Sequence, residues 1–191
     1  MRASTRARRR AILEGALDCY ADLGWTATTI ADLRERSGAS TGSIYHHFGD
    51  KEGVAAALYA EVLRRYREPL LAQMARRRTA RSVIRGIVIH HLEWAAAHPV
   101  WARFLVEMRG TDAVQRSEAA LREGTTDLVR HLFARLAPHL QRGAIVALPE
   151  PLFVPVILGP AQDVVRHWVR GRLDLDPSDV AAPLADAAWR R

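Results

Sequence analysis

The sequence of 191 residues contains no asparagine, one cysteine and one lysine, and these shortages limit what the chain can be. A lone cysteine, Cys19, excludes a disulfide framework and a cysteine-based zinc site. The longest weakly polar run, residues 152–161, is too short to cross a bilayer and contains two prolines. No apolar stretch follows the basic N-terminus, so we expect no signal peptide, no membrane partner and a cytoplasmic location.

The positive charge of the chain is an ambiguous feature. The formal net charge is +7, but 27 of the 28 basic residues are arginine and only Lys51 is lysine. This bias is typical of a GC-rich coding genome, so the charge alone does not indicate a nucleic-acid partner. It is also unevenly placed, because five arginines lie in residues 2–10 whereas residues 11–51 contain three basic and six acidic groups.

Apolar residues recur at helical spacing through almost the whole chain, and no alternating pattern of useful length predicts a strand. We therefore predict an all-α fold of about nine helices. Three short helices would form an N-terminal domain over residues 1–50, and a bundle of longer helices would follow over residues 51–191, with the fourth helix as the connector. The expected helices lie at about residues 5–24, 30–37, 41–48, 51–78, 84–98, 101–110, 112–143, 151–171 and 176–189.

Two of the short helices and the turn between them form a helix-turn-helix candidate. The first follows Thr29, a residue suited to cap it, and ends at a turn that contains Gly38. The second follows Ser40 and turns Ile44 and Phe48 inward, which leaves small polar and aromatic side chains outward, as suits a helix in a major groove. Structural hairpins often imitate this spacing, so the motif alone leaves a purely structural role open. The outward residues are Gly42, Ser43, Tyr45 and His46, with His47 on the flank.

Residues 24–54 resemble the DNA-binding signature of the TetR family of bacterial transcriptional regulators. The resemblance is sharp over about residues 5–55, and beyond them it rests on length, helix count and the long bundle. Arg34, Gly53 and Val54 depart from the residues usual in the family. The matching elements keep the order and spacing of the signature: Gly24, Thr28-Thr29, Ile30, Gly38, Ser40, Gly42, residues 44–48 and Lys51-Glu52.

The resemblance implies a homodimer that binds a double-stranded DNA operator. Thr29 and Ser40 would present capping hydroxyls and helix N-terminal N–H groups to phosphates. The residues nearest the base edges would be Thr41, Gly42 and Ser43, where Gly42 lets the backbone approach closely. Further phosphate contacts would come from Tyr45, His46, His47 and Lys51. A basic arm would enter the adjacent minor groove, or else form a solvated, disordered terminus; it consists of Arg2, Arg6, Arg8, Arg9 and Arg10.

The resemblance also implies that the bundle binds an unidentified small-molecule effector, without a cofactor, and pairs with a second subunit. Taken singly, each of the residues suited to an apolar pocket is more often ordinary core; they are Trp94, Trp101, Phe104, Met108, Leu128 and His131. The eighth expected helix offers an apolar face to a partner, with packing against the last helix of the same chain as the alternative. This face consists of Val164, Val165, Trp168 and Val169.

The resemblance implies a regulator, usually a repressor, and the sequence gives no sign of an enzyme. Ser40, Ser43 and Cys19 have no base at a recognisable spacing, so no catalytic site is expected. The eight histidines contain no i, i+4 pair, so no metal site is expected. A helical small-molecule binding or carrier protein without DNA binding is the alternative, and it would need neither the outward face nor Lys51. A third hypothesis, that the protein binds RNA or membrane surfaces, is based only on the positive charge.

Overall fold

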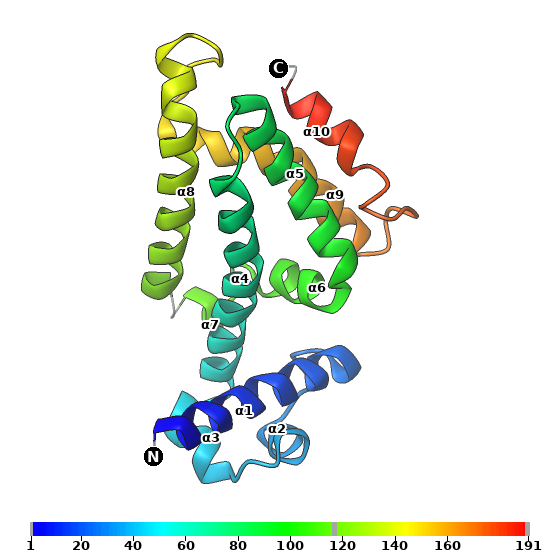
Figure 1. The fold of residues 1–191 in the computed structure, drawn as a ribbon. Coiled ribbons are helices and arrows are strands. Elements are labelled where there is room, and N and C mark those ends of the chain that lie inside the picture. The colour runs from blue at the N-terminus through cyan, green and yellow to red at the C-terminus, as the bar shows by residue number, and fades with distance from the viewer. Residues whose placement is uncertain (1, 116–117, 190–191) are drawn as a thin grey trace. The chain divides into compact units, whose positions relative to one another are not determined.

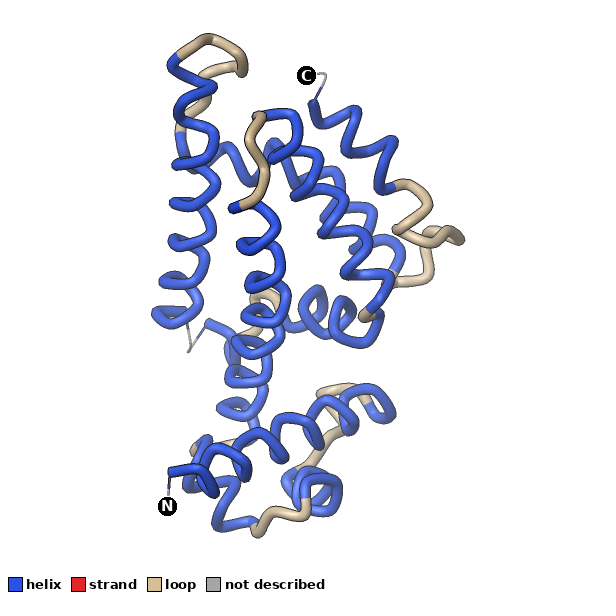
Figure 2. The backbone as a smooth tube through the Cα atoms, in the orientation of Figure 1, coloured by secondary structure: helices blue, strands red, loops and turns tan. Residues whose placement is uncertain are grey.

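The computed structural model describes residues 2–115 and 118–189, and within these ranges the chain is helical, with no strand (Figures 1 and 2). The predicted all-α fold is confirmed. The helices in this part of the chain are α1 (Arg2–Leu23), α2 (Ile30–Ser37), α3 (Thr41–Phe48), α4 (Lys51–Ala75), α5 (Ala80–Ala97), α6 (Pro99–Met108), α7 (Asp112–Gln115), α8 (Glu118–Gln141), a 3-10 helix η1 (Glu150–Leu152), α9 (Phe153–Trp168) and α10 (Ala181–Trp189).

Two elements differ from the nine expected helices. The helix expected over residues 112–143 is described as α7 and α8, on either side of two residues that lie outside the described part of the chain. The last helix begins later than expected, because the Asp176 carboxylate accepts hydrogen bonds from the backbone N–H and the hydroxyl of Ser178. This local turn takes the place of the first helical turn.

The described chain forms two compact units, and their boundary differs from the division expected at residue 50. One unit contains residues 1–63 and 107–121, and the other contains residues 64–106 and 122–191. Helices α4, α6 and α8 therefore each contribute residues to both units. The first unit extends beyond residue 50 because Val54, at the start of α4, is fully buried in its core.

The core of the first unit fixes α1, α2 and α3, of which only α2 and α3 are short, because α1 has 22 residues. Ile12 of α1, Leu33 of α2 and Ile44 of α3 are fully buried, and each lies on the inward face of its helix. Helix α1 ends at Leu23, where Gly24 adopts a φ of +76° that a residue with a side chain rarely takes. These contacts determine which face each short helix turns to solvent.

In the second unit, α5 packs against α9 and α10 (Figure 1). Asp186 of α10 forms ion pairs with Arg81 and Arg85 of α5, and hydrogen bonding to Arg85 lowers the pKa of this carboxyl group. In the described residues, no helix combines the length and the apolar character needed to span a membrane.

Candidate nucleic-acid interface

Helix α2 begins with a reciprocal cap. The Thr29 hydroxyl accepts from the backbone N–H of Asp32, and the Asp32 carboxylate accepts from the N–H and the hydroxyl of Thr29 at 2.7 Å each. Hydrogen bonding to Thr29 lowers the pKa of Asp32, so a negative charge remains at this helix end near neutral pH. The Thr29 hydroxyl is therefore not free for the expected phosphate contact, because it is bonded within the cap and a carboxylate lies beside it.

The turn between α2 and α3 is fixed by one backbone conformation and by hydrogen bonds from Ser37 and Arg8. Gly38 adopts a φ of +63°, which ends α2 and turns the chain. The Ser37 hydroxyl donates to the Leu33 carbonyl and accepts from the Ala39 N–H. From α1, the Arg8 guanidinium donates to the Gly38 carbonyl at 3.3 Å. The angle between the two helices is thus fixed by contacts both within and outside the motif.

Helix α3 presents a small polar face to solvent. The Ser40 hydroxyl caps it by accepting from the Ser43 N–H at 3.2 Å, and buried Ile44 sets its rotation. Ser43 and His47 are half-buried on its flanks. Of the residues that the helical wheel turns outward, Gly42, Tyr45 and His46 are exposed, with Tyr45 50% exposed, whereas Ser43 is not fully so. Ser40 and Thr41 are exposed as well.

Gly42 opens the first turn of α3. A Cβ atom built at this position meets no atom within 4 Å, so the backbone is uncovered and a side chain here would extend into open space. Free N–H groups at a helix N-terminus attract anions. The first turn of α3 can therefore approach the edge of a base or a phosphate closely.

Lys51 occupies a place that the sequence does not predict. Its ammonium donates to the carbonyls of Trp25, Thr26 and Thr28, at 3.0, 3.4 and 2.8 Å, and lies 5.7 Å from the centre of the Trp25 ring. A lysine ammonium has three N–H donors, and all three are used. Lys51 thus holds the loop between α1 and α2 rather than facing outward to a phosphate. The partners lie 23 to 26 residues away in the chain, so no local pattern reveals them.

The N-terminal arginines are part of α1, which starts at Arg2, and do not form a free arm. Besides the Arg8 contact described above, the Arg9 guanidinium lies 5.4 Å from the centre of the Phe48 ring. The Arg10 side chain pairs with Glu14 at 2.7 Å. Arg6 is exposed on α1, and of Arg2 only the helical backbone is described. A DNA contact from these arginines stays a prediction, and exposed Arg6 is the residue on which we test it.

One hydrogen bond connects α1 to the end of α6. The buried Tyr20 hydroxyl of α1 donates to the Glu107 carboxylate at 2.6 Å, and both residues belong to the first compact unit. The rest of α6, up to Val106, belongs to the second unit. This bond fixes the end of a helix that has residues in both units.

The six residues expected to line an effector pocket differ in burial and belong to both compact units. Phe104 is fully buried, Trp94 and Trp101 have ring centres 6.1 Å apart, and Met108 belongs to the other compact unit. The other two differ in exposure, because Leu128 is half-buried and His131 is exposed. Membership of one pocket stays a prediction for all six residues.

Sequence reasoning missed the polar groups beside Trp94. The Tyr66 hydroxyl is 3.1 Å from Nδ1 of His91, and Nε2 of His90 is 3.0 Å from the Tyr66 carbonyl oxygen. Burial lowers the pKa of His91 to about 4, so this ring is neutral at physiological pH. The His98 ring stacks on Trp101 with centres 4.8 Å apart. The sequence does place three histidines near Trp94, which could have indicated these polar groups. Because their spacing is not that of metal ligands, they were not predicted to form a site.

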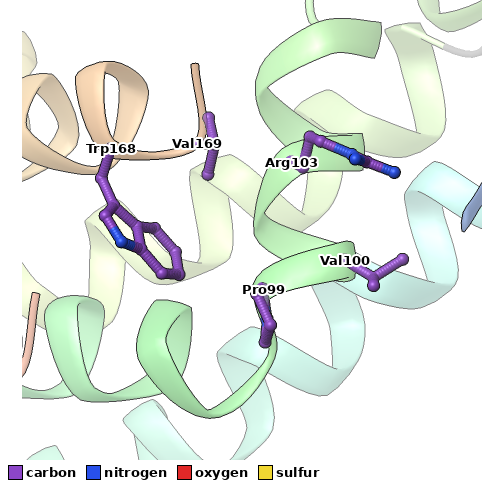
Figure 3. A pocket seen from close by; sticks show the side chains of 5 residues that line it. All are labelled: Pro99, Val100, Arg103, Trp168 and Val169. Atoms are coloured by element: carbon purple, nitrogen blue, oxygen red, sulfur yellow. The ribbon is translucent and has the colours of Figure 1, made fainter. Parts of the chain in front are cut away.

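The apolar face expected for dimerisation is only partly available. Val165 is 3% exposed and packs inside its own chain, so it cannot meet a partner. Trp168 and Val169 are half-buried and line a cavity of about 200 Å³ with Pro99 and Val100 of α6 (Figure 3). The outward side of α9 carries different residues. Leu152, immediately before α9, and Val156 are 45% and 50% exposed, and Pro160 continues the line at a spacing of four.

In the described part of the chain, no three histidine, cysteine or carboxylate side chains lie together in a way that could hold a metal ion. Cys19 is buried in α1, and burial raises the pKa of its thiol. A buried thiol that stays protonated is a poor nucleophile. The exposed face of α3 is therefore the surface in the first unit with the clearest chemistry for a partner.

The part of the chain that contains α2 and α3 is also similar to known proteins. Residues 12–58 match the model of the bacterial regulatory proteins, tetR family. The HTH-type transcriptional regulator BetI of Paraburkholderia phymatum is 30% identical over 186 residues, which cover 93% of this chain and 87% of that protein. The HTH-type transcriptional repressor AcnR of Corynebacterium glutamicum is 49% identical over 53 residues, 28% of each chain.

A solved structure matches the fold over nearly its whole length. The fatty acid degradation regulator FadR from Bacillus halodurans has a TM-score of 0.78 and 21% sequence identity, and the match covers 94% of this chain and 97% of that chain. At this identity the likeness establishes the fold alone. The helix-turn-helix unit and the second unit are thus both parts of a known architecture.

Proposed function

Because the chain belongs to the TetR family, it is a transcriptional regulator and not an enzyme, and we propose that it is a ligand-responsive repressor. In this proposal a cytoplasmic homodimer binds a palindromic DNA operator and is released when a small molecule binds. The name of the similar AcnR protein supports repression rather than activation. The observation that carries the proposal is the exposed, capped first turn of α3 with uncovered Gly42.

In the proposed complex, α3 lies in the major groove. Thr41, Gly42 and Ser43 would lie nearest the base edges, and Ser40 with the free N–H groups of the first turn would meet a phosphate. The side chains that would hold the DNA backbone on either side are Tyr45, His46 and His47. Thr29 and Lys51 are omitted, because their donors are used within the protein.

A palindromic operator has two half-sites, so two DNA-binding units are needed. In the proposed homodimer, α9 offers the surface through which the two subunits pair. Its outward line of Leu152, Val156 and Pro160 is apolar and exposed. We expect Val156→Asp to raise the dimer dissociation constant at least about a hundredfold, because a carboxylate would be buried without a partner. Analytical ultracentrifugation measures this change.

The matched control for dimerisation is Val146→Asp, because Val146 is 67% exposed in the loop after α8. This variant should keep the wild-type dissociation constant. If Val156→Asp remains as strongly dimeric as Val146→Asp, the outward side of α9 is not the dimer interface.

The route from effector to DNA is proposed to pass through α4 and α6, two of the helices with residues in both compact units. The Tyr20–Glu107 bond anchors the end of α6 to α1. An effector that favours one arrangement of α6 would then change the state of the DNA-binding unit.

We expect Tyr20→Phe to reduce the effect of the effector on operator affinity by about five- to tenfold, with little change in affinity when no effector is present. Operator dissociation constants with and without effector measure this coupling. Glu107→Gln, which keeps an oxygen acceptor for Tyr20, should preserve it. Equal coupling in Tyr20→Phe and the wild type would remove this bond from the route.

Footprinting on the DNA that flanks the gene, repeated with candidate effectors, tests the proposed function directly. A protected palindrome that is lost when an effector is added is the expected result. If no site is protected there or in a selection from random sequences, the result favours the alternative, a helical small-molecule carrier that does not bind DNA.

A further inference from the structure

The last turns of α4 carry a cavity that contains none of the residues expected to bind an effector. Its volume is about 350 Å³, within the range of small-ligand sites. The lining residues recur at spacings of three and four along the end of α4 and the two residues that follow it. They are Pro69, Ala72, Gln73, Arg76 and Arg77, all in the second compact unit.

Two buried polar atoms of the residues that line this cavity lack a hydrogen-bond partner. Oε1 of Gln73 and Nε of Arg77 are buried and form no hydrogen bond within the described structure. Buried polar atoms are rarely left unpaired, because they have lost water without gaining a replacement. The oxygen and nitrogen of a glutamine amide exchange places by a simple flip, so Gln73 can offer either an acceptor or a donor here.

The Arg77 side chain packs against a glycine, Gly86, which leaves room for its guanidinium. Gly86 lies in the middle of α5, and a Cβ atom added to it would come within 2.3 Å of Nε and 2.5 Å of Cζ of Arg77. Glycine is a poor helix former, so its presence inside α5 has a local cost. It leaves space for the planar guanidinium, which any larger residue would displace.

The arginines are not needed to cap the end of α4. The Ala75 carbonyl accepts from the Arg135 guanidinium of α8. The Gln73 and Met74 carbonyls accept from the backbone N–H groups of Arg76 and Arg77, at 3.3 and 3.1 Å. The side-chain donors in the cavity therefore remain available for a ligand.

We propose that this cavity binds a small organic oxyanion, a carboxylate or a phosphate ester. Arg77, with Arg76 at the rim, supplies positive charge and N–H donors, since guanidinium groups match oxyanions in geometry. The Gln73 amide donates a further hydrogen bond, and Pro69 and Ala72 contact the apolar part of the ligand. The proposal rests on the proposed function in one respect: it gives the chemical class of the effector.

Calorimetry on the full chain without DNA tests the site. Benzoate is expected to bind, and benzamide, a neutral molecule of nearly the same shape, should bind at least about tenfold more weakly, because a charge-assisted hydrogen bond is lost. Inorganic phosphate is the third probe. Tighter binding of phosphate than of benzoate assigns the site to phosphate esters, and the reverse assigns it to carboxylates. If neither anion binds better than benzamide, the proposal is overturned.

Variants locate the bound anion. Arg77→Gln and Gly86→Ala should each weaken the preferred anion by about ten- to a hundredfold, the first by removing the charge and the second by displacing the guanidinium. Arg78→Gln is the matched control, because Arg78 is exposed and does not line the cavity. Circular dichroism verifies folding. Wild-type affinity in Arg77→Gln, or equal loss in Arg78→Gln, overturns the proposal.

These measurements fail separately from the proposed function. Footprinting needs no ligand to reveal an operator, and calorimetry needs no DNA to reveal the anion. A protein that protects an operator but binds no anion would keep the proposed function and lose this inference. A protein that binds benzoate through Arg77 but protects no DNA would keep the site as that of a carrier.

Discussion

Replacing Gly42 by leucine is expected to lower specific operator affinity about a thousandfold or more, to the level of non-specific binding. The reason is steric. The position lies in the first turn of α3, where the backbone is uncovered and a Cβ atom meets nothing within 4 Å. A leucine would therefore fit the free protein without strain, yet it would occupy the space that the base edges need. Fluorescence anisotropy with operator and scrambled duplexes measures the loss.

The control for this prediction is Gly42→Ala, which adds one methyl group at the same position and favours the helix. It should bind the operator within about tenfold of the wild type. Circular dichroism and ultracentrifugation should show folded dimers for both variants. If the leucine variant keeps operator affinity within tenfold of the wild type, α3 does not enter the groove through this turn.

Lys51→Met is expected to lower both the stability of the DNA-binding unit and its affinity for every DNA sequence. Methionine keeps most of the side-chain length but leaves the Trp25, Thr26 and Thr28 carbonyls without the ammonium. Hydrogen bonds to a charged donor contribute about 2 kcal/mol to stability, so the free energy of unfolding should fall by about this amount. Urea unfolding measures it.

The salt dependence of binding decides between the two roles considered for Lys51. A residue that contacts a phosphate contributes about one unit to the slope of log K against log salt concentration. Because the Lys51 donors are used inside the protein, the slope should not change in Lys51→Met. Arg6→Gln is the comparison, since exposed Arg6 is the proposed contact and its loss should lower the slope by about one unit. A lower slope for Lys51→Met with unchanged stability would restore the phosphate contact expected from sequence.

The helix-turn-helix unit was predictable from sequence because its determinants are local. Thr29, Gly38 and Ser40 set the ends of α2 and α3 by bonds or backbone angles within a few residues. Ile44 sets the rotation of α3 through helical periodicity. These patterns operate over three to eight residues, so the outward face of α3 follows from them directly.

The second unit was less predictable, because an apolar stripe does not state what it faces. Val164, Val165, Trp168 and Val169 were expected to meet a partner chain, yet Val165 is buried against its own. The exposed line of Leu152 and Val156 lies on another side of the same helix. Either side satisfies the spacing of an amphipathic helix, and only the packing of α5 and α10 on α9 decides between them.

What the sequence determined by itself was the helical fold, the resemblance to the family and the outward face of α3. The tertiary structure decided which cations are available. Arg8, Arg9 and Lys51 hold carbonyls or a ring that lie 23 to 39 residues away in the chain, whereas Arg77 lies in a cavity beside Gly86 with its Nε unpaired. The physical reason is that a charge acts on whatever is near it in space. Its number and sign can be read from the sequence, but its partner depends on how distant segments pack.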